Sequence, residues 1–187
     1  MADLWGRLRA SWPKGRTASP PKRNPILTSH FARYKGSLYF HFPGGKEELA
    51  ALALSHSGNE VCEVIQRAFS SSKTIEQGLK EVFALFIAGL EQSGFRAGCP
   101  VGNVAAEAPD SERVAEAVAA TFQQWHVTLR DRLVQAGLRA RRSDELAEFI
   151  LAGFEGGVLL SKAKRATRPL QTALKEIIHV LRLENVR

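Results

Sequence analysis

Apolar residues recur at intervals of three and four from Lys46 to the end of this 187-residue chain. That spacing places them on one face of an α-helix, whereas a half-buried β-strand alternates apolar and polar residues. We find no convincing alternating segment in this part of the sequence. The sequence therefore predicts an all-α body of successive amphipathic helices, without an internal repeat.

The first two predicted helices are close together in the chain. One opens at Lys46 and is weakened in its middle by Ser57 and Gly58. The next begins at a capping box, in which Thr74 and Gln77 satisfy backbone amides that the first helical turn leaves unpaired. Its apolar stripe widens until nearly every side of the helix is apolar, which predicts a central position in the fold.

A turn-rich connection at 98–103 and a short helical piece that ends near Pro109 come next. Asp110 or Ser111 then caps the helix with the clearest apolar stripe, and Gly137 ends it.

Two more helices are predicted towards the C-terminus. A basic linker, 139–142, precedes a helix that starts at Ser143, and Pro169 in a first-turn position opens the last helix. The last helix carries one apolar face, made of Leu170, Leu174, Ile177, Ile178 and Leu181.

Basic residues are concentrated at the N-terminus. Residues 1–46 contain nine Lys or Arg and one acidic residue, a net charge of +8, whereas the remaining residues contain 17 basic and 18 acidic ones, a net charge of −1. This asymmetry is typical of a nucleic-acid-facing end, and a solvated basic tail is the alternative. Four prolines before residue 26 predict a largely irregular leader over 1–34, and an organelle transit peptide is a further alternative.

Several classes of protein fit the sequence poorly. The longest apolar run, 149–160, is shorter than the roughly 20 residues that a membrane-spanning helix needs. With two cysteines and no signal-peptide pattern, we expect a reduced, cytoplasmic protein. The five histidines are dispersed, and no phosphate loop or metal-ligand spacing is present, so we expect neither an enzyme nor a cofactor or metal.

The segment KGSLYFHFPGGKEEL, residues 35–49, resembles the recognition helix and the start of the following helix in the TetR/AcrR family of transcriptional repressors. A second segment, GCPVGNVAAE at 98–107, is similar to the signature of the lincomycin-resistance-repressor type of C-terminal domain within that family. The resemblance covers about Lys35 to the end. It implies a TetR-like fold: a remnant helix-turn-helix over 35–54, then a helical ligand-binding and dimerisation domain over 55–187.

The resemblance also implies DNA contacts. The second helix of a helix-turn-helix enters the major groove, where short or polar side chains allow close approach and longer ones reach phosphates or base edges. The candidate DNA-binding residues are Lys35, Gly36, Ser37, Tyr39, His41 and Lys46. The alternative is that the aromatic residues of this segment belong to the core and that His41 is an ordinary surface residue.

Residues 1–34 depart from the family pattern, because the two upstream helices are not legible there. Arg33 and Tyr34 stand where the family has a tight Gly turn and a small capping residue. This suggests a shifted reading frame, an altered start or a divergent N-terminus. We therefore expect a ligand-responsive repressor that binds a double-stranded operator, with binding weakened if the N-terminus is incomplete. The alternative is a dimeric small-molecule-binding protein that has lost specific DNA recognition.

For the body, the resemblance implies a cavity for a small apolar or aromatic inducer. The candidate ligand-binding residues are Phe83, Phe86, Cys99, Asn103, Phe122, Trp125, Phe149 and Phe154. A plain packed core is the alternative for the aromatic residues, an inert structural cysteine for Cys99 and a turn cap for Asn103.

The resemblance further implies a homodimer built from the last two helices. Residues 149–160 are apolar on every side and include three glycines, so one copy cannot easily cover them. With the Leu170–Leu181 stripe they predict a two-fold, four-helix interface. Glu155 inside this run needs a partner, and we expect Lys162, Lys164 or Arg165 from across the interface.

Overall fold

The computed structural model describes residues 38–107 and 110–184, and all regular secondary structure in these two ranges is helical. The prediction of an all-α body is therefore confirmed. A short helical turn at 38–41 precedes six helices: α3 (Gly45–Ser71), α4 (Ile75–Gln92), α5 (Pro100–Ala106), α6 (Glu112–Gln135), α7 (Ala140–Lys164) and α8 (Arg168–Leu183).

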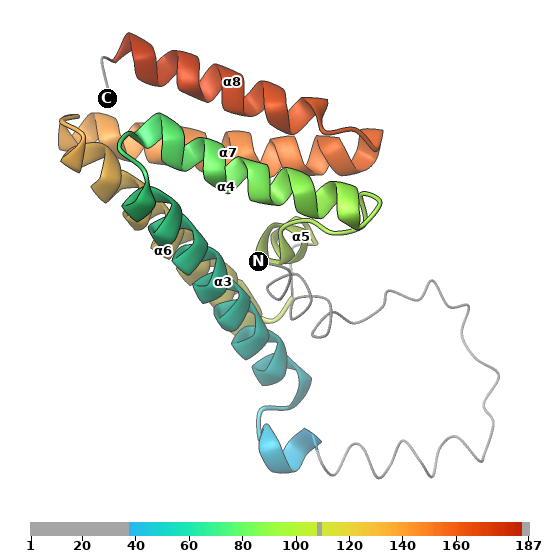
Figure 1. Ribbon diagram of the computed structural model, residues 1–187. Coiled ribbons are helices and arrows are strands. Elements are labelled where there is room, and N and C mark those ends of the chain that lie inside the picture. The colour runs from blue at the N-terminus through green and yellow to red at the C-terminus, as the bar shows by residue number, and fades with distance from the viewer. Residues whose placement is uncertain (1–37, 108–109, 185–187) are drawn as a thin grey trace.

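The helices form two groups that meet at an angle (Figure 1). α3 and α6 lie side by side as one long pair, whereas α4, α7 and α8 pack together across the end of that pair. The turn at 38–41 lies at the opposite end of α3, away from α4, α7 and α8 (Figure 1). The short α5 lies against α3 and α6.

α3 is one continuous helix, so the weak point expected at Ser57 and Gly58 does not interrupt it. Gly58 is buried, and a Cβ atom placed there would collide with the Cγ2 of Thr121 on α6. The indole Nε1 of Trp125 also donates a hydrogen bond of 2.9 Å to the Gly58 carbonyl oxygen. The glycine therefore allows the backbone of α3 to approach α6, and this packing outweighs its poor helix propensity of about 1 kcal/mol.

The capping box before α4 forms with one shift, because Gln77 pairs with the residue before the Thr74 N-cap and not with Thr74 itself. The Thr74 hydroxyl accepts a hydrogen bond of 3.2 Å from the Gln77 amide, and the Gln77 Oε1 accepts one of 3.0 Å from the Lys73 amide. α4 packs against α3, α7 and α8, which is the central position that its wide apolar stripe predicts.

The start of α7 corrects one sequence prediction. The helix begins at Ala140 and not at Ser143, so most of the expected basic linker is helical. Arg142 explains this, because its guanidinium pairs with Glu145 one turn on, at 3.0 Å, and with Glu184 at the end of α8, at 2.8 Å. The start of α8 agrees with expectation, since Pro169 lies in its first turn.

The apolar stripe of α8 corrects a second prediction. Leu170, Ile177 and Leu181 are at most 3% exposed within the single chain, where α8 packs on α7 and α4. These side chains belong to the protomer's own core and are not free to form an interface between two copies. None of the helices in the described ranges is long and apolar enough to cross a bilayer.

Candidate functional site

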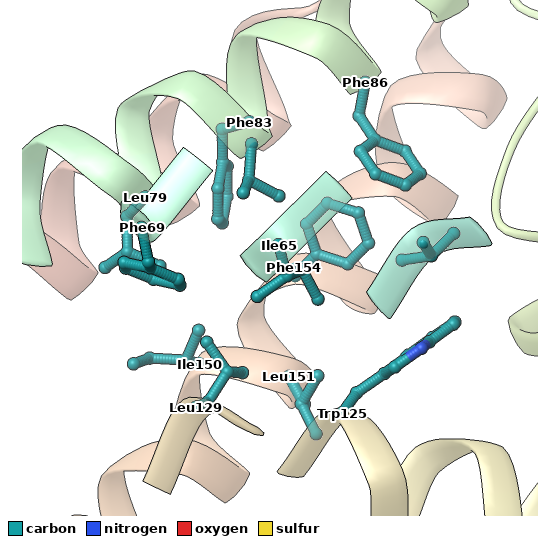
Figure 2. A pocket seen from close by; sticks show the side chains of 12 residues that line it. Ile65, Phe69, Leu79, Phe83, Phe86, Trp125, Leu129, Ile150, Leu151 and Phe154 are labelled. Atoms are coloured by element: carbon teal, nitrogen blue, oxygen red, sulfur yellow. The ribbon is translucent and has the colours of Figure 1, made fainter. Parts of the chain in front are cut away.

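Side chains of α3, α4, α6 and α7 line a small cavity of about 30 Å³ (Figure 2). Its walls are apolar side chains, and the only polar group among them, the indole N–H of Trp125, already donates to the Gly58 carbonyl. This volume holds one or two water molecules, whereas pockets for drug-sized ligands measure roughly 300–1,000 Å³. A ligand of that size enters only if the side chains around the cavity move apart.

Phe154 is the centre of the aromatic part of the wall. Its ring makes edge-to-face contacts with Phe83 and Phe86 of α4, with centroid separations of 5.2 Å and 4.6 Å. Trp125 lines the cavity from α6, where Phe122 makes an edge contact with it at 5.4 Å. Edge-to-face contacts are individually weak, so rearranging the Phe83–Phe154 pair around an apolar guest costs little, whereas Trp125 is fixed by its hydrogen bond to Gly58.

Four of the eight candidate ligand-binding residues therefore meet at the cavity, namely Phe83, Phe86, Trp125 and Phe154. Phe122 does not line it. Phe149 lies on the outer face of α7 with 46% of its surface exposed, because helical geometry turns it away from Ile150, which does line the cavity. The sequence reasoning missed the aliphatic wall, although its spacing was visible: Val61, Ile65, Leu79, Val82, Leu129, Ile150 and Leu151, together with Phe69.

Cys99 and Asn103 do not line the cavity either; they belong to a polar cluster between α5 and α7. The Cys99 Sγ accepts a hydrogen bond of 3.3 Å from the Gly102 amide and so caps α5. The Asn103 Oδ1 accepts one of 3.1 Å from Lys162 on α7. Gly102 leaves room for the carboxyl group of Glu155, which would collide with a Cβ atom at that position.

Glu155 corrects a third prediction, because it faces α5 of its own chain and not a basic residue across an interface. Its carboxylate accepts a hydrogen bond from the Cys99 thiol, while its Oε1 is buried without a partner. Burial raises the pKa of Glu155, and the bond from Cys99 opposes that rise. Burial and the nearby Glu155 charge raise the pKa of the Cys99 thiol well above its usual value, so Cys99 is a poor candidate for a reactive sensor.

Three of the six candidate DNA-binding residues lie among the residues that the structure describes. Lys35, Gly36 and Ser37 lie outside them. Tyr39, His41 and Lys46 are exposed at the end of α3 that is remote from α4, α7 and α8. Among the described residues of this segment, Tyr39 and its neighbour Phe40 are 57% and 81% exposed, whereas Phe42 is partly buried.

Polar contacts connect this end of the molecule to the start of α6. The Ser111 hydroxyl donates a hydrogen bond of 3.0 Å to Glu47 Oε2 in the first turn of α3. The guanidinium of Arg113 packs on Gly44, just before α3. α6 thus touches α3 at its first turn through these groups and near its middle through Trp125.

Comparison with known proteins identifies the family. A family model described as "Transcriptional regulator LmrA/YxaF-like, C-terminal domain", a TetR-type C-terminal domain, matches residues 76–176. The HTH-type transcriptional regulator LmrA of Bacillus subtilis is 33% identical over 141 residues, which cover 73% of either chain. The chain belongs to the TetR family. The HTH-type transcriptional regulator Rv0196 of Mycobacterium tuberculosis is 32% identical over 167 residues, 84% of this chain and 82% of that protein.

Solved structures agree on the TetR fold. A TetR transcriptional regulator from Legionella pneumophila superposes with a TM-score of 0.68 at 19% identity, covering 83% of this chain and 84% of the other. The regulatory protein TetR from Rhodobacter sphaeroides gives 0.66 at 22% identity, with 76% and 79% covered. TetR proteins are transcriptional regulators. Within the described ranges, no group of three His, Cys, Asp or Glu residues is placed to hold a metal ion.

Proposed function

We propose that this protein is a cytoplasmic, ligand-responsive transcriptional repressor that binds an operator as a homodimer and releases it when a small apolar or aromatic inducer binds. The observation that supports this most is the path of α3. Its first turn follows the exposed segment 38–41, while Val61, Ile65 and Phe69 in its second half line the apolar cavity. One continuous helix thus connects the candidate DNA-binding end to the candidate ligand site.

The proposed mechanism follows from the size of the cavity. An inducer must push apart the side chains of α3, α4, α6 and α7, because about 30 Å³ does not accommodate it. Such a movement displaces α3, and with it the DNA-binding segment that precedes it. In a dimer, the spacing of the two recognition helices then no longer matches two half-sites one helical turn of DNA apart.

The outer face of α7 is the proposed dimer interface. Phe149, Leu159 and Leu160 are 46–59% exposed there, an unusual apolar surface for a single chain. Between them, a Cβ atom added to Gly156 would meet nothing within 4 Å, so a second helix has room to approach. The buried stripe of α8 takes no part in this interface.

The interface is tested by Leu160→Glu, which places a charge in the apolar face. We expect the dimer to dissociate into monomers at micromolar concentration in sedimentation or light-scattering measurements. Leu183→Glu is the matched control, since Leu183 is 70% exposed on α8, outside the proposed face. A wild-type chain that is monomeric at these concentrations contradicts the proposal.

The experiment for DNA binding is a titration of the full chain against its own promoter region at about 0.15 M salt. We expect retarded complexes that survive excess non-specific competitor DNA and that a bound inducer dissociates. Lys46→Ala should weaken binding. It should also reduce the slope of log K against log salt concentration by about one, because one phosphate contact is lost. Lys175→Ala, which changes an exposed lysine of α8, is the control.

The same titration examines the alternative function. A dimer that binds small molecules but attaches to DNA only weakly, without sequence preference and with steep salt dependence, is the alternative: a ligand-binding protein with impaired specific DNA binding. The unusual composition of residues 1–34 is the observation that favours it.

A further inference from the structure

The mechanism described above does not use Glu155, although this residue is chemically the most unusual one in the body of the protein. Its Oε1 is buried and has no hydrogen-bond partner. No Lys, Arg or His in the described ranges forms an ion pair with it, and the nearest candidate on α7, Lys162, donates to Asn103 instead. Buried carboxylates without a positive partner are costly, so this arrangement calls for an explanation.

Glu155 does not itself line the apolar cavity, but it lies on α7 one helical turn beyond a residue that does. Leu151, one helical turn earlier on the same face of α7, lines the cavity, and so does the adjacent Phe154. On its other side the carboxyl group rests on Gly102, and the Cys99 thiol, 1% exposed, donates to it. The carboxyl group thus lies between α5 and the turn of α7 that lines the cavity, with one oxygen unused.

We propose that Glu155 is the polar anchor of the ligand site and that the site takes a protonated amine whose apolar or aromatic body fills the enlarged cavity. The inference rests on the proposed function, which by itself names only an apolar or aromatic inducer. An ammonium group supplies both the missing positive charge and a donor for Oε1. The rings of Phe86, Trp125 and Phe154 suit the rest of such a ligand, because aromatic faces attract cations and aromatic or apolar groups pack on them.

The test compares two probes that share one body, 4-phenylbutylamine and 4-phenylbutan-1-ol, by calorimetric titration of the full chain. The wild-type protein should bind the amine about tenfold more tightly than the alcohol, as expected for one charge-assisted hydrogen bond. Glu155→Gln should abolish this preference and leave the affinity for the alcohol within about twofold of the wild-type value. Glu148→Gln, an exposed glutamate on the same helix, should behave as the wild type.

The outcomes separate the two proposals. Equal binding of both probes to the wild type, or an amine preference that persists in Glu155→Gln, overturns the anchor while the apolar ligand site stands. Failure of both probes to bind the wild type overturns the apolar site and the anchor together. The wild-type comparison does not depend on the folding of any variant.

Discussion

The two halves of α3 differ in how they are attached to the rest of the chain. In residues 58–71, seven residues are buried, and three of them line the cavity. In residues 45–57, only Gly45 and Leu54 are buried, and Leu49 and Leu52 are 40% and 52% exposed. The first half contacts the start of α6 through the hydrogen bond between Ser111 and Glu47, and Leu54 packs in the core near its end.

This difference indicates where the helix is able to pivot. The second half is anchored in the core next to the candidate ligand site, and the first half carries the candidate DNA-binding segment with few buried contacts. The two meet at Gly58, which packs directly against Thr121 of α6 and accepts the hydrogen bond from Trp125. A displacement in the core is therefore transmitted to the exposed end with little resistance from packing.

The largest effect is expected from truncating one apolar residue in each half. Ile65→Ala, at 5% exposure, should lower the free energy of unfolding by about 2–5 kcal/mol, because it leaves a cavity in the core. Leu52→Ala should change it by about 0.5 kcal/mol or less, since its side chain is half exposed. Urea denaturation of both variants measures this; similar losses for the two would remove the contrast between the halves.

A smaller effect is expected at the boundary between the halves. Gly58→Ala should destabilise the chain by about 1–3 kcal/mol, because the new methyl group collides with the Thr121 Cγ2. Adding Thr121→Ala should recover part of that loss, since it removes the colliding atom. Thermal unfolding of the two single variants and the double variant completes the cycle, and strict additivity would argue against close contact at this point.

The helices themselves could largely be predicted from the sequence, because caps and apolar spacing act locally. Thr74 with Gln77, and Pro169, placed the starts of α4 and α8 correctly. Tertiary contacts decided the exceptions. Glycine weakens a helix locally, but position 58 has no room for a Cβ atom beside Thr121 of α6. The run of arginines around Arg142 resembles a linker in sequence, but ion pairs of Arg142 with Glu145 and Glu184 hold it within α7.

The candidate site was less predictable, for a geometric reason. Spacing places aromatic residues on a helix face but does not say what that face contacts when the helix is apolar on every side. Phe149 and Phe154 both lie in such a run; one is exposed and the other is at the centre of the wall. The partner of Glu155 was misjudged for the same reason, since the approach of α5 depends on the folded connection at 98–103.

The polar contact at the exposed end should contribute little to stability. Ser111→Ala removes the hydroxyl that donates to Glu47 and should cost about 0.5 kcal/mol or less, because the bond is exposed to solvent. It should nevertheless speed hydrogen exchange of amides in residues 45–53 and leave those in 58–71 unchanged. Equal acceleration in both halves would show that the contact supports the whole helix.

The smallest effect is expected from an exposed ion pair between Glu76 of α4 and Arg182 of α8. Hydrogen bonds from Arg182, and then from Lys80, lower the pKa of Glu76 from 4.5 to about 2. Because the folded-state pKa is depressed, the pair stabilises the protein above about pH 4.5, and this contribution fades as the pH falls towards 2. Arg182→Gln should lower Tm by about 2 °C or less at pH 7, with a smaller difference at pH 3. A difference that grows on acidification would contradict this assignment.

The contrast within α3 is tested most directly by native-state hydrogen exchange along this one helix in the full chain. The account predicts that amides in residues 46–57 exchange about 100-fold faster than those in residues 60–71, because local opening of the first half exposes little apolar surface. Uniform protection along α3 would mean that the helix moves and opens only as one unit with the core, and it would contradict the pivot at Gly58.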